Sequence, residues 1–289
     1  MNIKALILCT LLTAWFPALS PASSLPLESL VLDLDASKGV KLEDENRVTI
    51  WTNQAPNAIA RDFIKRDKGR EEPGSGRPTR RTQVAELNGK PSIIFRQQEL
   101  VCFDEDTFDG LTMGKGHTWV SVIAVYDQRV GLKDVNSFFG NLRNGGKCEG
   151  LWGCLDDDNT LWYGGRNGIT FGRFDANNPK LLGPRLIKNR FHLLAARMGA
   201  GTDTVKTELF VDDSAKPYSV GKFPVNTEAN PSRLVIGQER DAVQHPGRES
   251  FDGEIARLLI WERPLADSEL QATFRLLRKL YQLESPREE

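Results

Sequence analysis

Three consecutive carboxylates give the chain its best local candidate for a cation site. Asp156, Asp157 and Asp158 are followed directly by Asn159. Calcium needs several oxygen ligands at close range, and carboxylates and amides supply such oxygens. We therefore predict Asp156, Asp157 and Asp158 as possible Ca²⁺ ligands, with Asp175, Asn177 and Asn178 as a second candidate. The same composition is typical of a turn whose residues tolerate a left-handed backbone, so both interpretations stay open.

Aromatic side chains flank this acidic turn. Sugar rings stack their C–H faces on aromatic rings, while nearby amides and carboxylates bind the sugar hydroxyls. The turn therefore predicts a carbohydrate-binding rim, whose proposed residues are Trp152, Trp162, Tyr163 and Asn159. The alternative is that these rings pack the edge of the fold around a local disulfide.

The cysteines suggest that disulfide. Cys148 and Cys154 flank the short segment Glu149–Gly153, and a bridge between them is the simplest pairing in an exported protein. Cys102 lies in an apolar run and is expected to be a buried free thiol.

No arrangement of residues points to catalysis. A laminarinase-type glycosidase would carry two carboxylates on one strand face within a Glu-x-Asp-x-x-Glu pattern, which is absent. The three histidines, His117, His192 and His245, have no companions at catalytic spacing, and no nucleophile elbow is present. We therefore expect a protein that is not an enzyme, and keep a polysaccharide hydrolase or lyase as the alternative.

A basic segment runs from Lys65 to Gln83 and contains seven lysines and arginines. Such a segment could bind an acidic polysaccharide or phosphate. The alternative is a surface loop, because Glu71 and Glu72 already offset part of its positive charge.

The net charge and the N-terminal sequence indicate which partners and which cellular location to expect. The formal net charge is −1, which argues against a nucleic-acid-coating protein. Residues 1–22 are typical of a secretory signal, with Lys4, the apolar run Ala5–Phe16 and the small residues Ser20–Ala22. An N-terminal membrane anchor is the alternative. No later segment is apolar enough to span a bilayer, so we expect a secreted, periplasmic or cell-surface protein.

The elements that must position these residues are mostly strands. About a dozen short segments alternate apolar and polar residues between turn residues, a pattern that favours an all-β sandwich or barrel. Thr118–Tyr126 is apolar on both faces, as expected for a central strand that is covered on both sides. A single helix is predicted over 267–283, with one apolar stripe formed by Leu270, Phe274, Leu277 and Tyr281.

The order of these motifs resembles the laminin G-like and concanavalin A-like jelly-roll domains of secreted bacterial proteins. The matching segments are Leu32–Ser37, Val48–Gln54, Pro91–Phe95, Thr118–Tyr126, Phe191–Leu194, Glu208–Asp213, Leu234–Gly237 and Phe251–Leu265.

This resemblance implies an all-β, two-sheet antiparallel jelly-roll sandwich with one C-terminal helix, in a single domain over 23–289. It also implies that calcium could lie on the rim of the sandwich. The expected function is a non-catalytic recognition or adhesion module that binds a glycan or an extracellular protein. A purely structural surface protein is a third possibility.

Overall fold

A computed structural model describes residues 24–283, apart from 57, 66–75, 129–134, 144–146, 171, 173–174, 213–214 and 240–248. The predicted signal peptide at 1–22 lies outside these residues, as does His245. Within the described residues the chain forms seventeen strands and one α-helix, and every pair of named strands is antiparallel. The predicted all-β class and antiparallel pairing are therefore confirmed.

A first run of strands is built around the strands β8 and β17. In order of pairing its members are β15 (Ser219–Pro224), β14 (Thr204–Val211), β13 (Phe191–Met198), β8 (His117–Val125) and β17 (Asp252–Trp261). The far side of β17 pairs with β1 (Leu30–Asp35) along its C-terminal half and with β6 (Lys90–Arg96) along its first residues. β5 (Thr79–Val84) pairs with β6.

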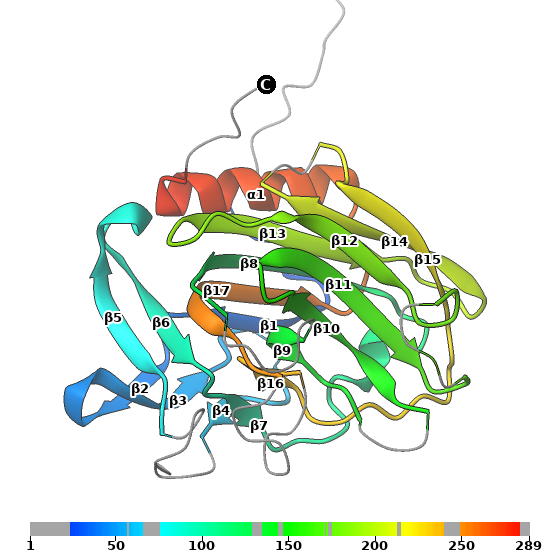
Figure 1. Ribbon diagram of the computed structural model, residues 1–289, viewed down its shortest axis with the longest axis horizontal. Coiled ribbons are helices and arrows are strands. Elements are labelled where there is room, and N and C mark those ends of the chain that lie inside the picture. Colours follow the sequence, from blue (N-terminus) through cyan, green and yellow to red (C-terminus); the bar gives the residue numbers. More distant parts are fainter. Residues whose placement is uncertain are drawn as a thin grey trace, which may run out of the picture.

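A second run includes β10 (Glu149–Leu155) and β11 (Thr160–Asn167), which lie in front of β8 and β17 in Figure 1. Its members, in order of pairing, are β12 (Lys180–Arg185), β11, β10, β9 (Asn136–Gly140), β16 (Val235–Ile236), β7 (Leu100–Cys102), β4 (Asp62–Ile64), β3 (Arg47–Thr52) and β2 (Val40–Glu43). In the described part of the chain, three short 3₁₀ helices connect strands: Asp44–Asn46, Ala85–Leu87 and Asp109–Leu111.

The two runs do not form separate sheets. Arg47 of β3 pairs with Thr79 of β5, and this pair joins both runs into one hydrogen-bonded network. The predicted division into two distinct sheets is therefore not observed, because the β5–β6 hairpin bridges from one run to the other.

The main core lies between the two runs. Trp119 and Ile123 of β8 pack in one cluster with Phe138 of β9, Leu151 of β10 and Tyr163 of β11. Each large apolar side chain buried in this way contributes about 1.5–3 kcal/mol. The clustering shows that β8 turns alternate residues toward the second run.

The opposite face of β8 packs on the helix. Val120, Val122 and Ala124 share a second cluster with the helix stripe Leu270, Phe274, Leu277 and Tyr281. All nine residues of β8 are buried. The prediction of a central strand covered on both faces is confirmed, and so is the apolar stripe of the helix.

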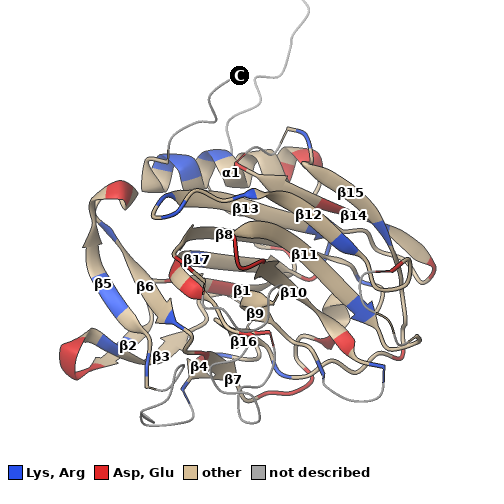
Figure 2. Cartoon of the chain, viewed as in Figure 1, with Lys and Arg blue, Asp and Glu red and all other residues tan. Residues whose placement is uncertain are grey.

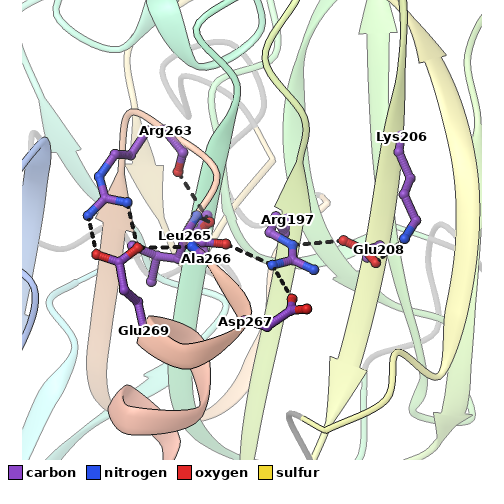
Figure 3. A network of polar contacts seen from close by, with 9 residues as sticks. Arg197, Lys206, Glu208, Arg263, Leu265, Ala266, Asp267 and Glu269 are labelled. Atoms are coloured by element: carbon purple, nitrogen blue, oxygen red, sulfur yellow. Dashed lines mark hydrogen bonds and ion pairs between the residues drawn. The ribbon is translucent and has the colours of Figure 1, made fainter. Parts of the chain in front are cut away.

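The helix α1 (Asp267–Tyr281) ends two residues earlier than predicted, where Gln282 adopts a left-handed backbone. Ala266 at the N-cap has no polar side chain, and the start of the helix is held by Glu269 and Arg197 (Figure 3). Glu269 accepts a hydrogen bond from the Ala266 backbone N–H at 2.9 Å and binds Arg263 at 2.7 Å. Arg197 of β13 donates to the Leu265 carbonyl at 2.7 Å, which ties the helix start to the sheet. Among the described residues, no helix is both long and apolar enough to cross a membrane.

Candidate functional site

The sheet face that carries α1 also bears polar side chains, beyond the apolar residues that pack on the helix. On β17, Glu254 lies opposite Ala124 of β8, so both side chains are on the same face of the sheet, and a β-bulge follows between Ile255 and Arg257. Ala124 packs in the cluster that contains the α1 stripe, and it precedes Tyr126 by two residues. Glu254 and Tyr126 therefore lie on the helix side of the sheet, beyond the residues that pack on α1.

We call the polar group at this position the open-face cluster. It consists of Arg81 of β5, Ser92 and Arg96 of β6, Tyr126 directly after β8, and Asp252 and Glu254 of β17. Figure 2 shows acidic residues at the start of β17 beside basic residues on β5 and β6. Three segments far apart in the sequence meet here, namely the β5–β6 hairpin, the residue after β8 and the strand β17, and the hairpin and β17 supply charges of opposite sign.

Glu254 is the centre of the open-face cluster. Its side chain is only 3% exposed, yet it lies on a strand among apolar neighbours. One carboxylate oxygen accepts hydrogen bonds from the Tyr126 hydroxyl and from Arg81 Nη1, the latter at 3.0 Å. The other oxygen accepts from the Ser92 hydroxyl. A buried carboxylate needs such donors, because burial of an unpaired charge is very unfavourable.

Asp252 lies on the same strand face, two residues before Glu254. Its Oδ2 accepts a hydrogen bond from Gln97 Nε2 at 3.1 Å, and Arg96 Nη1 lies 3.9 Å from its Oδ1. Gln128 bonds to both the N–H and the C=O of Asp252 and donates to Asn159 Oδ1 at 3.0 Å. The predicted ligand residue Asn159 is therefore linked to this cluster, although it is itself buried.

The two arginines are the exposed members of the cluster. Side-chain exposure is 55% for Arg96 and 40% for Arg81. The Arg96 guanidinium carbon lies 4.0 Å from the centre of the Tyr126 ring, a cation–π contact. Burial, followed by the hydrogen bond to Glu254, raises the pKa of Tyr126 above its ordinary value. The phenol therefore stays protonated and serves as a donor rather than as a nucleophile.

The predicted aromatic rim is not exposed. Trp152 is 2% exposed and Trp162 is 0% exposed. Their rings meet edge to face at 5.7 Å in a small cluster with Val135, Leu142 and Cys154. Lys180 Nζ lies 4.6 Å from the Trp162 ring centre, over its face. These rings cannot stack on a sugar in this arrangement, and any part they play in ligand binding stays a prediction.

Tyr163 faces the opposite side of its strand and belongs to the main core. Its hydroxyl donates to His117 Nε2 at 2.8 Å, and His117 Nδ1–H donates to the Leu111 carbonyl at 2.7 Å. A neutral imidazole makes both hydrogen bonds, since Nε2 accepts and Nδ1–H donates. Complete burial lowers the pKa of His117 from 6.5 to about 4.

The lowered pKa of His117 predicts a loss of stability in acid. The unfolded chain binds a proton below about pH 6.5, whereas the folded chain resists it until about pH 4. Stability is therefore fully present above pH 6.5 and decreases as the pH falls toward 4, by about 3 kcal/mol at most. An NMR titration of the imidazole signals should give His117 a pKa near 4. A value close to 6.5 would contradict the buried, neutral imidazole.

The acidic turn forms the tip of the β10–β11 hairpin. Asn159 donates its N–H to the Asp156 carbonyl at 3.0 Å and has a φ of 70°, as expected for a turn residue in the left-handed region. Asp156 binds Lys180 at 3.0 Å. Asp158 accepts from the Thr160 N–H at 2.9 Å, and hydrogen bonds to Thr160 lower its pKa.

Calcium binding has no direct support in this geometry. Among the described residues, no group of three or more His, Cys, Asp or Glu side chains is arranged to hold a metal ion. The second candidate is also a turn, in which Asp175 Oδ1 accepts from the N–H groups of Asn177 and Asn178. Calcium at Asp156, Asp157 and Asp158 stays a prediction.

The predicted Cys148–Cys154 disulfide is wrong. Both cysteines are free, and Cys154 is buried beside the Ser137 hydroxyl. The residues between them form strand β10 rather than a loop. An extended strand separates Cα atoms six residues apart by about 20 Å, and a disulfide needs less than about 7 Å. Cys102 is buried and free, as predicted.

Asp252 and Glu254 were missed because the sequence Phe251-Asp252-Gly253-Glu254 is typical of a turn. The structure places Asp252 and Gly253 inside β17. The available signal was the spacing of two carboxylates at i and i+2 ahead of an apolar strand. The basic segment was also misjudged in part, since Thr79–Val84 is strand β5 and Lys65 pairs with Glu99. Residues 66–75 of that segment lie outside the described residues.

Comparison with known proteins gives a fold but no family. No family model and no curated protein match the chain. Among solved structures, Trypanosoma rangeli sialidase in complex with the inhibitor DANA matches with a TM-score of 0.54 and 14% identity. That match covers 92% of this chain and 35% of the sialidase chain, so this chain spans about a third of the sialidase. The likeness shows a shared fold and nothing finer.

Two more distant matches add nothing to that argument. The CBM40 of Ruminococcus gnavus IT-sialidase gives a TM-score of 0.42 at 14% identity, over 56% of this chain and 84% of its own. A SAP-like pentraxin from Limulus polyphemus gives 0.38 at 14% identity, over 60% and 73%.

Proposed function

We propose that this chain is a secreted carbohydrate-recognition module built on a concanavalin A-like jelly-roll sandwich, without catalytic activity. The position of the main core between two runs of strands supports the sandwich. The likeness to a sialidase, an enzyme that acts on glycans, supports a glycan-related role. Secretion rests on the sequence of residues 1–22.

The observation that carries the proposal is the open-face cluster. It presents the exposed guanidinium groups of Arg81 and Arg96 beside the Tyr126 phenol, on paired strands beyond the residues that pack on α1. Sugar hydroxyls are bound by such groups, which both donate and accept hydrogen bonds. Strands hold these side chains more rigidly than loops would, so binding orders few groups.

A hydrolase is less well supported. Asp252 and Glu254 do share a strand face, as the two carboxylates of a glycosidase can. However, both oxygens of Glu254 already accept hydrogen bonds, and its side chain is buried. It cannot reach a sugar carbon without breaking three contacts. We therefore expect no release of reducing or unsaturated ends from a panel of polysaccharides.

A glycan array tests the proposed function. Residues 23–289 should bind a defined set of glycans, and Glu254→Gln should weaken that binding because it loosens Arg81 and Tyr126. The matched control is Arg275→Gln, an exposed arginine on α1, which should bind as wild type does. Absence of binding to every glycan would refute the proposal and favour a protein partner or a structural role.

A further inference from the structure

Among the described residues, the Arg96 guanidinium contacts Asp252 and the Tyr126 ring but makes no hydrogen bond. Arg96 Nη1 lies 3.9 Å from Asp252 Oδ1, which is too long for a hydrogen bond. Within the described part of the chain, no acceptor lies within hydrogen-bonding distance of its side-chain nitrogens. The side chain is 55% exposed, so a ligand in solution can reach it.

Arg96 is nevertheless held in place. Its guanidinium lies 4.0 Å from the Tyr126 ring centre, and Asp252 lies at one edge. Tyr126 is in turn anchored by its hydroxyl to the buried Glu254. An exposed arginine normally loses much side-chain entropy when it binds a ligand. Here the stacking on Tyr126 has already removed part of that freedom. The guanidinium N–H groups of Arg96 are therefore pre-organised for binding.

From this we infer that the open-face cluster binds the carboxylate of an acidic sugar through Arg96, with Arg81 as a second cation. The inference rests on the proposed function and names its ligand class. A planar guanidinium matches a planar carboxylate with two parallel N–H···O bonds, which are stronger than hydrogen bonds between neutral groups.

Arg81 completes the arrangement from the neighbouring strand. Its Nη1 donates to the same Glu254 oxygen that accepts from Tyr126. Its contact with Glu86 is long, at 3.5 Å, and its side chain is 40% exposed. Arg81 and Arg96 therefore both contact the Tyr126–Glu254 pair. This region is also where the basic segment Lys65–Gln83 meets the sheet.

The buried carboxylates limit how the acidic sugar binds. Asp252 and Glu254 are 5% and 3% exposed and balance the two arginines, so the cluster has no net charge. A ligand carboxylate would be repelled if it reached as deep as Glu254. It must instead stay at the exposed edge of Arg96, with hydroxyls toward Tyr126. Binding therefore depends on hydrogen-bond geometry more than on long-range attraction.

The test compares matched ligands and matched variants. The array carries uronate-, sialate- and sulfate-containing glycans, and the carboxyl-reduced form of each uronate and sialate. The best acidic glycan and its reduced form are then measured by calorimetry. Wild type should prefer the acidic form by about tenfold or more, which is the loss expected for a bidentate charged contact.

Arg96→Gln should remove the preference for the acidic glycan over its reduced form. Arg96→Lys should keep only part of that preference, because an ammonium cannot form two parallel hydrogen bonds to a carboxylate. Arg275→Gln should change nothing. Arg96→Gln removes the 3.9 Å ion pair with Asp252 and the stacking on the Tyr126 ring, so it should lower the free energy of unfolding by about 1 kcal/mol and leave the protein folded.

The outcomes separate this inference from the proposed function. If wild type binds the reduced glycan as tightly as the acidic one, or if Arg96→Gln binds like wild type, the inference is wrong and carbohydrate recognition stands. The inference is also wrong if binding depends on the sulfate groups of the glycan and not on its carboxylate. If no glycan binds, the proposed function fails and this inference fails with it.

Discussion

Trp162→Ala is expected to destabilise the protein by about 3–5 kcal/mol, the range for removing a fully buried tryptophan from a packed cluster. The ring is 0% exposed and packs against Trp152 at 5.7 Å. For a chain of this size, that loss lowers Tm by roughly 10 °C. Urea denaturation followed by circular dichroism measures the change in the free energy of unfolding.

Leu182→Ala is the matched control. Leu182 lies opposite Trp162 on the neighbouring strand β12 and is 52% exposed. Its loss should change stability by about 0.5 kcal/mol or less, as at most exposed positions. If Trp162→Ala folds with wild-type stability and loses glycan binding instead, the ring belongs to an exposed rim and the packing described above is incorrect.

Arg257→Ala should destabilise the protein about as much as Trp162→Ala, because it leaves two aspartates buried without their cation. Arg257 binds Asp33 through two hydrogen bonds of 2.9 and 2.8 Å and lies 3.4 Å from Asp35. All three residues are buried. Breaking a buried pair by removing one partner costs about 3–5 kcal/mol. This contact joins β1 to β17, so its loss also loosens the strand that carries Glu254.

The comparison variant is Arg275→Ala, which removes an exposed arginine from α1. It should shift the urea midpoint very little. A small effect of Arg257→Ala, similar to that of Arg275→Ala, would mean that Asp33 and Asp35 are solvated and that β1 does not close the sheet as described.

The elements of the fold were predictable where a periodic pattern is long. Thr118–Tyr126 carries apolar residues on both faces, and the apolar stripe of the helix recurs through Leu270 and Phe274. Both patterns depend only on local spacing, and the structure confirms both. The joining of the two runs through Arg47 and Thr79 has no local signal, because residues 32 positions apart form the pair.

The candidate site was harder to predict than the fold. Trp152 and Trp162 alternate along their strands as rim residues would, but sequence does not show that Val135 and Leu142 cover them. The spacing of Cys148 and Cys154 fits a loop, and only the pairing of β10 with two other strands excludes it. Arg96 becomes notable only through its position beside Tyr126, a residue 30 positions away in sequence.

The crystal structure of the complex with the best glycan from the array tests the central claim most directly. The account predicts sugar density over the open-face cluster, with a carboxylate oxygen within about 3 Å of an Arg96 guanidinium nitrogen. Density at the β10–β11 hairpin instead, against Asp156–Asn159 and a rearranged Trp162, would contradict it.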